Sequence, residues 1–313
     1  MGKVHRCPEE LLQQDLSGKV FVVTGGNSGI GRVTVDQLSK QGGTVVLACR
    51  KPEEGEKVKT ELAKTNPKAA SIEVEQLDLA SLKSVRAFAE RVTKNHPSIH
   101  CLVNNAGVMN TPFGKTEDGF EMQIGTNHLG HYLLTELLIP TLQKGSRIIN
   151  VSSCFHDKAM GREGVIDFDD LFFEKRKYDG WTAYAQSKLA NVLHAKQLAI
   201  RLKDQGVLAA SVHPGWVRSN LMRHSMPLWM QNYLLRPFLK LSGMIEPWEG
   251  TQTSLFAILT PDLQSGAFYS QLGIYRTKEA NKGGWPMESP NPHANDPETA
   301  KRLDEVSRKL VGL

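Results

Sequence analysis

Long apolar runs are absent from this chain of 313 residues. No stretch approaches the roughly 18 consecutive apolar residues that a membrane-spanning helix needs, so we expect no transmembrane segment. The first twenty residues also lack the apolar run of a signal peptide. The sequence therefore predicts a cytoplasmic protein.

Cysteine is scarce, and its four positions are Cys7, Cys49, Cys101 and Cys154. They form no CxxC pair and no disulfide framework, which predicts reduced thiols. His128 and His131 are three residues apart on a predicted helix, but no further ligand stands at a metal-binding spacing. Helix packing or capping therefore explains these histidines better than a metal, and we expect no metal site.

Clustered charge of one sign is also lacking. The net charge is +5, with charged residues making up 23% of the chain, and the lysines and arginines are scattered among glutamates and aspartates. A nucleic-acid surface would need a basic cluster, so we expect solvated helix faces and no nucleic-acid partner. The slight basic excess suits an anionic cofactor.

Strand and helix patterns alternate along most of the chain. Apolar runs predict strands at 20–24, 44–50, 71–79, 99–107, 146–153 and 207–215. Helical spacing predicts helices at 30–42, 53–66, 82–96, 129–142, 183–206 and 298–313, with one more near Glu249 and a loop-like tract at 281–297. This order predicts an α/β fold with a doubly wound parallel sheet of the Rossmann type, in a single domain spanning 1–313.

A glycine-rich loop follows the first predicted strand and precedes the first predicted helix. Its residues are Gly25, Asn27, Ser28, Gly29, Ile30 and Gly31, with glycines in the pattern G-x3-G-x-G. Gly29 would let the backbone approach a pyrophosphate at the helix N-terminus, and Gly31 would let helix and strand pack closely. The loop alone favours a nucleotide and leaves a purely structural turn open.

The end of the second predicted strand indicates which nucleotide binds. A site for NAD usually has Asp or Glu here to hold the ribose 2′-hydroxyl, whereas this chain has Cys49 followed by Arg50. A cation without a competing carboxylate suits a 2′-phosphate. We therefore predict NADP(H) as the cofactor, with a solvated arginine at a strand end as the alternative.

Tyr184 and Lys188 stand four apart on a predicted helix and therefore share one face. An ammonium beside a phenol favours the phenolate, so we expect Lys188 to lower the pKa of Tyr184. Such a tyrosine can act as general acid in carbonyl reduction. Ser153, at the end of the fifth predicted strand, could donate to the same carbonyl oxygen. A surface pair and an ordinary strand end are the respective alternatives.

Several motifs together resemble the short-chain dehydrogenase/reductase family. They are TGGNSGIG, NNAG, TNHLGHYLL, NVSS, YAQSK and HPGWV, in the family's order and approximate spacing. The resemblance covers about Ser17 to the C-terminus. Within the family, ACR, YAQSKLANVL and the closing DPETAKRLDEVSRKLVGL are similar to the branch of retinol dehydrogenases and WW-domain oxidoreductases.

The resemblance implies a role for each matching residue. Tyr184 would transfer the proton, Ser153 would polarise the substrate oxygen, Lys188 would hold the nicotinamide ribose, and Asn127 would anchor a water in the proton relay. The remaining implied contacts are to cofactor: Asp78 and Leu79 to adenine, Asn105, Ala106 and Gly107 to the adenosine side, and Pro214, Gly215 and Val217 to the carboxamide.

The same resemblance divides the domain into an N-terminal extension at 1–16, a substrate lid at 221–248 and a C-terminal extension at 281–313. The lid is rich in Leu, Met and aromatic residues, which favours a small lipophilic alcohol or carbonyl substrate. Packing onto the core, surface contact with a membrane and a homo-oligomer contact stay open as further uses of this segment.

The chain also departs from the family pattern. It lacks the apolar anchoring segment with which many members of the branch begin, and it has Asp304 where a tryptophan is common. The interval from Ser153 to Tyr184 is wide, and its extra residues would lie near the substrate mouth. The alternative function is a catalytically idle dinucleotide-binding scaffold or sensor. The joint presence of Asn127, Ser153, Tyr184 and Lys188 disfavours it.

Overall fold

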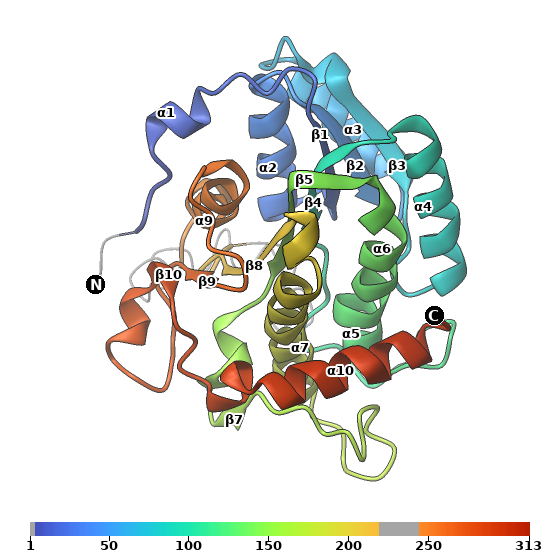
Figure 1. Ribbon diagram of the computed structural model, residues 1–313, viewed down its shortest axis with the longest axis vertical. Coiled ribbons are helices and arrows are strands. Elements are labelled where there is room, and N and C mark those ends of the chain that lie inside the picture. The colour runs from blue at the N-terminus through green and yellow to red at the C-terminus, as the bar shows by residue number, and fades with distance from the viewer. Residues whose placement is uncertain (1–3, 219–243) are drawn as a thin grey trace, which may run out of the picture.

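An eight-stranded sheet forms the centre of the protein (Figure 1), whose computed structural model describes residues 4–218 and 244–313. The strand order is β10-β9-β8-β5-β4-β1-β2-β3, and all neighbouring strands run parallel except β10, which pairs antiparallel with β9. The bounds are β1 Val20–Thr24, β2 Thr44–Cys49, β3 Ile72–Gln76, β4 Ile99–Asn104, β5 Leu142–Val151, β8 Leu208–His213, β9 Phe268–Ser270 and β10 Gly284–Met287. A separate hairpin joins β6 Lys158–Ala159 to β7 Arg162–Glu163.

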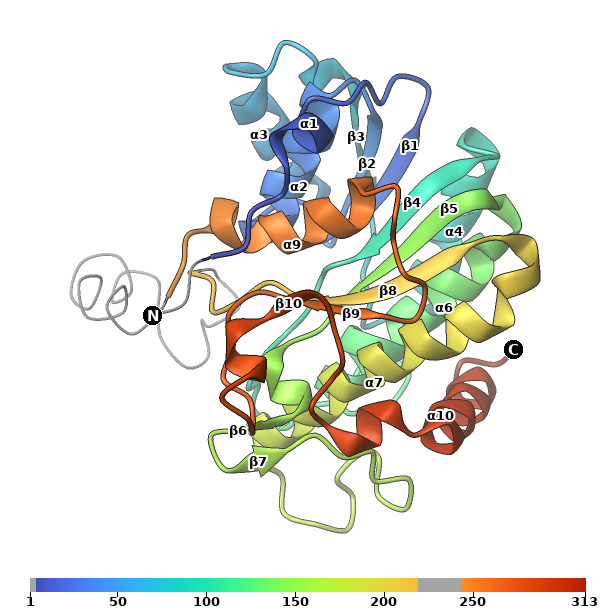
Figure 2. The same ribbon diagram turned by 60° about the vertical axis from the view of Figure 1, so that its left-hand side comes forward.

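Helices cover both faces of the sheet (Figure 2). Their bounds are α1 Glu9–Leu12, α2 Gly29–Lys40, α3 Pro52–Ala63, α4 Leu82–Asn95, α5 Met122–Ile124, α6 Gly130–Leu138, α7 Gly180–Arg201, α9 Pro247–Leu259 and α10 Pro297–Leu310. Side chains alternate between the faces along each strand. Phe21 of β1 therefore packs in the core with α2 and α9, whereas Val22 packs in the core with α4 and α6. The doubly wound fold is thus confirmed.

Four strands were not predicted from the sequence: the hairpin strands β6 and β7, and β9 and β10 of the central sheet. The prediction of a loop at 281–297 is wrong in part, because it contains the edge strand β10, and β9 was not predicted at all. Three residues of β9 are too few to show periodicity, and Pro286 weakens the strand pattern of β10. The helix predicted at 129–142 also ends early, at Leu138, because Pro140 cannot continue it.

The C-terminal helix α10 packs on α6 and α7 (Figure 1). Asp304, the residue that departs from the family pattern, accepts a hydrogen bond of 2.9 Å from the Tyr132 hydroxyl and pairs with Arg201 at 2.9 Å. His128 bonds to the Ser307 hydroxyl at 2.8 Å. Helix packing, as predicted, accounts for His128, and polar contacts attach α10 to the helices beneath it.

All four cysteines are buried free thiols, which agrees with the sequence prediction. Within 4–218 and 244–313, no helix has the length and apolar character that crossing a membrane requires. The same described residues contain no group of three side chains suited to hold a metal ion.

Buried histidines should make the fold sensitive to acid. Burial lowers the pKa of His131 and of His156 to about 4, and that of His128 and of His213 to about 3. Their unfolded pKa is about 6.5, so the unfolded state binds more protons as pH falls from 6.5 towards 4. We expect the free energy of unfolding to fall by at least about 1.4 kcal/mol between about pH 7.5 and 5.5. Urea titrations at both pH values measure this; equal or higher stability at the lower pH would contradict it.

Candidate active site

The parallel strands end at a common edge, and a cleft of about 1460 Å³ lies there. Residues following β1, β2, β4, β5 and β8 line it. This is the edge at which open α/β sheets bind ligands. Except for Asn127, every site residue predicted from the sequence lines this cleft.

The glycine loop has the predicted close packing. Gly25 has a positive φ of 66°, and a Cβ added at Gly31 would stand 2.3 Å from the Gly25 carbonyl oxygen and 2.6 Å from the Asn105 amide nitrogen. A side chain at position 31 therefore cannot fit unless the loop moves. Helix α2 begins at Gly29, and no side chain caps its first turn, so its free backbone N–H groups suit an anion.

The side chain of Asn105 holds the start of the glycine loop. Its side-chain amide donates to the Thr24 carbonyl oxygen at 2.7 Å, and its backbone N–H donates to the Thr24 hydroxyl at 2.9 Å. These bonds join the ends of β1 and β4. The sequence assigned Asn105 to the cofactor, and the structure adds that its side chain holds the glycine loop in place.

Arg50 is exposed at the end of β2 and lines the cleft. Within the described part of the chain it forms no ion pair. Glu54, the carboxylate one turn along α3, is already engaged by Lys51 at 3.3 Å and by the Asn27 side chain at 3.0 Å. The Arg50 guanidinium is therefore available to an anion in the cleft.

Asp78 and Leu79 follow β3 and reach the same cleft. The Asp78 carboxylate accepts from the Ala80 N–H at 2.9 Å, which fixes the turn. A Cβ added at Gly130 would stand 2.4 Å from the Leu79 carbonyl oxygen, so this turn packs closely on α6. Both residues therefore line the same cleft as the glycine loop.

Tyr184 and Lys188 are buried on α7 at the inner end of the cleft. Asp179 caps this helix by accepting from the Thr182 N–H at 2.8 Å. The Lys188 ammonium donates to the Val151 carbonyl oxygen at 3.1 Å and lies 5.6 Å from the centre of the Tyr184 ring. The spacing of four residues therefore brings the two groups together, as the sequence predicted.

The prediction that the protein lowers the pKa of Tyr184 is wrong. Burial raises the pKa of the Tyr184 phenol well above its usual value, and a polar contact with the Ser153 side chain only partly offsets this. Burial also lowers the pKa of Lys188 to about 8, because it removes the ammonium from water. The sequence shows the spacing of such a pair but not the desolvation that opposes its charges.

Asn127 lies in a π-helical turn, Gly125–Leu129, behind the cleft. Its side chain accepts from the Val108 N–H at 2.8 Å and donates to the Val108 carbonyl at 2.9 Å and the Ser187 hydroxyl at 2.9 Å. A Cβ added at Gly107 would stand 3.1 Å from its Oδ1 and 3.5 Å from the Lys188 ammonium. Asn127 therefore belongs to the same cluster, although its side chain is occupied by protein partners.

Ser153 ends the segment after β5 and faces the cleft beside Tyr184. Its hydroxyl accepts from the Phe155 N–H at 3.3 Å, as the N-cap of the 3-10 helix Cys154–His156. This contact uses a lone pair of the hydroxyl oxygen and not its proton. Ser153 and Tyr184 thus offer two O–H groups at one end of the cleft.

An aromatic wall stands beside Tyr184. Phe155 stacks on Trp181 with 4.9 Å between ring centres, and its ring meets the Tyr184 ring edge-on at 5.7 Å. Met160, 62% exposed, also lines the cleft. The sequence predicted only that the segment after Ser153 lies near the mouth; it did not single out these side chains, whose stacking depends on tertiary contact.

Pro214, Gly215 and Val217 follow β8 and line the cleft. Val217, which precedes the predicted lid, pairs with Ile245 in an isolated bridge. Of the lid at 221–248, only residues 244–248 are described, and the prediction for 221–243 lies outside the described residues.

Comparisons with known proteins agree with the fold. The model of the family described as short chain dehydrogenase matches residues 19–164. Bovine retinol dehydrogenase 12 (Bos taurus) is 42% identical over 95% of this chain and 88% of its own length. Retinol dehydrogenase 11 of Mus musculus is 46% identical with the same coverage. The crystal structure of an uncharacterised protein from Mycobacterium paratuberculosis is 34% identical, with a TM-score of 0.74 over 96% of this chain and 95% of that one.

Proposed function

This chain belongs to the short-chain dehydrogenase family, and we propose that it is an NADP(H)-dependent oxidoreductase that interconverts a lipophilic alcohol and its aldehyde or ketone. The observation that carries this proposal is the juxtaposition of Ser153, Tyr184 and Lys188 at the inner end of the cleft. Two hydroxyl groups and one ammonium meet there, as acid–base chemistry on a carbonyl oxygen requires.

The described residues fit a nicotinamide dinucleotide. Arg50 and Tyr184 both line the cleft, and so does the uncapped first turn of α2, which suits an anion. The missing Cβ at Gly31 leaves room for close backbone approach. Arg50, with no carboxylate competing at the end of β2, supports NADP(H) over NAD(H).

When bound, the cofactor supplies or accepts the hydride. Tyr184 holds the proton: because its pKa is raised, the phenol is protonated at neutral pH and can donate to a carbonyl oxygen. Ser153 donates a hydrogen bond to the same oxygen and so stabilises developing negative charge. Lys188 places a positive charge beside Tyr184 and is fixed by the Val151 carbonyl, while Asn127 orients the backbone behind it.

The substrate class follows from the wall of the cleft. Phe155, Trp181, Met160 and Met109 present apolar and polarisable surface next to Ser153 and Tyr184. Such a wall binds bulky apolar molecules better than sugars or small anions. Retinol, named for the relatives in cattle and mouse, has this character, and we propose that retinoids or similar lipophilic compounds are the substrates.

In a series of straight-chain aldehydes, kcat/KM should rise with chain length. Each added methylene that enters the apolar cleft gains up to about 0.8 kcal/mol, roughly fourfold, until the cleft is filled. Steady-state rates with NADPH measure this series. Trp181→Ala should flatten the rise, because it removes the ring that stacks on Phe155. Highest activity on a small polar or anionic substrate would contradict the proposed class.

The cytoplasmic location and a homo-oligomeric state, both considered from the sequence, stay predictions. Cell fractionation and light scattering of the purified chain test them separately.

A further inference from the structure

We propose that the C-terminal extension acts on the reaction: Ser289, through His156, positions Ser153 for its contact with the substrate oxygen. This inference rests on the proposed function, because it assumes that Ser153 donates to that oxygen. His156 and Ser289 are positioning residues and do not line the cleft, within the described part of the chain.

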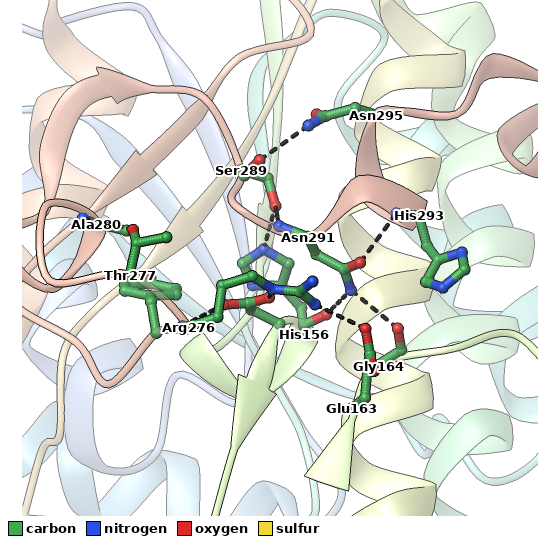
Figure 3. Close-up of polar contacts among 12 residues, drawn as sticks. His156, Glu163, Gly164, Arg276, Thr277, Ala280, Ser289, Asn291, His293 and Asn295 are labelled. Carbon is green, nitrogen blue, oxygen red and sulfur yellow. Dashed lines mark hydrogen bonds and ion pairs between the residues drawn. The ribbon is translucent and has the colours of Figure 1, made fainter. Parts of the chain in front are cut away.

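His156 contacts Ser289 (Figure 3) and, on its other ring nitrogen, Ser153. Its Nδ1 is 2.6 Å from the Ser153 carbonyl oxygen, and its Nε2 is 2.7 Å from the Ser289 hydroxyl. A carbonyl oxygen only accepts, so Nδ1 carries the proton. Nε2 then accepts, and the Ser289 hydroxyl must donate to it. One tautomer therefore satisfies both contacts.

The bridge is fully buried. His156 has no exposed surface, and burial lowers its pKa to about 4, so the ring is neutral at physiological pH. The Ser289 hydroxyl accepts from the Asn291 N–H at 3.2 Å, which completes its hydrogen bonding. Asn291, also fully buried, donates its side-chain amide to the carbonyl oxygens of His156 and Gly164 (Figure 3). The segment 289–291 thus contacts His156 twice: Ser289 bonds to its ring, and Asn291 bonds to its backbone carbonyl.

A second set of contacts holds the segment 154–164. Asp157, next to His156, has no exposed surface and pairs with Arg276, whose backbone N–H also donates to that carboxylate at 2.8 Å. Arg276 continues to Glu163 of β7 at 2.8 Å (Figure 3). Residues 154–164 are therefore held by Arg276, Ser289 and Asn291, which follow β9 in the chain, as well as by the sheet.

These contacts bear on Ser153 because its backbone carbonyl receives two bonds from His156. Besides the ring, the His156 backbone N–H donates to it at 3.0 Å. These two bonds fix the Ser153 carbonyl, and so they also fix the backbone position from which the Ser153 side chain extends into the cleft. A hydrogen-bond donor must stand within hydrogen-bond distance of the atom on which negative charge develops. A small shift of the Ser153 backbone would therefore lower the rate of the chemical step.

A double-mutant cycle tests the inference on the full chain, with retinal and NADPH as the probes. Ser153→Ala should lower kcat by about 100-fold or more. Ser289→Ala should lower kcat by about 10-fold, with the Kd for NADPH unchanged. In the Ser153→Ala background, Ser289→Ala should change kcat less than about twofold, because no hydroxyl remains to be positioned.

The matched control is Ser307→Ala. Ser307 is a buried serine of the C-terminal extension that bonds to His128 Nε2 at 2.8 Å, so its loss removes the same kind of contact. The Asn127 side chain bonds to Val108 and Ser187 and not to His128, so the catalytic cluster stays intact. Ser307→Ala should lower Tm about as much as Ser289→Ala does but leave kcat within about twofold.

A second pair of variants covers the case in which Ser289→Ala does not fold. His156→Asn keeps a donor at the position of Nδ1, whereas His156→Leu keeps none. We expect His156→Asn to retain at least about 10-fold more kcat than His156→Leu at equal folded fraction.

The outcomes separate the two claims. If Ser153→Ala keeps wild-type kcat, the catalytic role of Ser153 fails and the inference fails with it. If Ser153→Ala is slow but Ser289→Ala lowers kcat equally in both backgrounds, or matches Ser307→Ala, only the inference is overturned. Equal kcat for His156→Asn and His156→Leu overturns it as well.

Discussion

Replacing Tyr184 with phenylalanine is expected to lower kcat by at least about 100-fold. The substitution keeps the ring, and with it the packing against Phe155, but removes the phenolic proton next to Ser153. Because the change affects proton transfer and not the glycine loop, the Kd for NADPH should stay nearly the same. Steady-state kinetics and a fluorescence titration measure the two quantities.

Tyr132→Phe is the matched control. Tyr132 is also fully buried, but its hydroxyl donates to Asp304 on α10, away from the cleft. We expect this variant to lose some thermal stability and to keep its turnover. A Tyr184→Phe variant that retains more than about a tenth of wild-type kcat would show that another group moves the proton.

The second large effect concerns the cofactor. Arg50→Ala should weaken NADPH binding by about 10- to 150-fold, because a charge-assisted contact with a phosphate contributes about 1.5–3 kcal/mol. NADH, which has no 2′-phosphate, should bind with unchanged affinity. Parallel titrations of the two cofactors measure the difference.

Lys51→Ala supplies the comparison for Arg50→Ala. Lys51 is the adjacent cation and also lines the cleft, but its ammonium is already paired with Glu54 at 3.3 Å. Its loss should weaken NADPH binding less than the loss of Arg50 does. Equal affinity of the unaltered protein for NADPH and NADH would contradict the assignment of Arg50.

The sequence was sufficient for the central sheet from β1 to β8, because buried strands and amphipathic helices each carry a local period. It also located the glycine loop and the Tyr184–Lys188 pair, because residues a few positions apart on one element stay neighbours however that element packs. The strands β9 and β10 could not be predicted in this way. The three-residue strand β9 forms by pairing with β8, which lies far from it in the sequence. The edge strand β10, which contains Pro286, forms by pairing with β9.

The environment of the site residues was also beyond sequence reasoning. The type and spacing of Tyr184 and Lys188 say nothing of burial, which raises one pKa and lowers the other. The bridge from Ser153 to Ser289 joins residues 136 positions apart through His156, and only tertiary structure reveals it. Motifs therefore locate the reacting groups, and packing decides their protonation and position.

A single reaction tests the proposed function most directly: purified chain, NADPH and all-trans-retinal, with NADPH oxidation and alcohol formation followed together. The proposed function predicts one alcohol formed for each NADPH oxidised, at a rate that Tyr184→Phe nearly abolishes. Tight binding of NADPH with no turnover of retinal or of any aldehyde, ketone or quinone in a broad panel would contradict it. That result would identify the chain as a dinucleotide-binding scaffold built on the same fold.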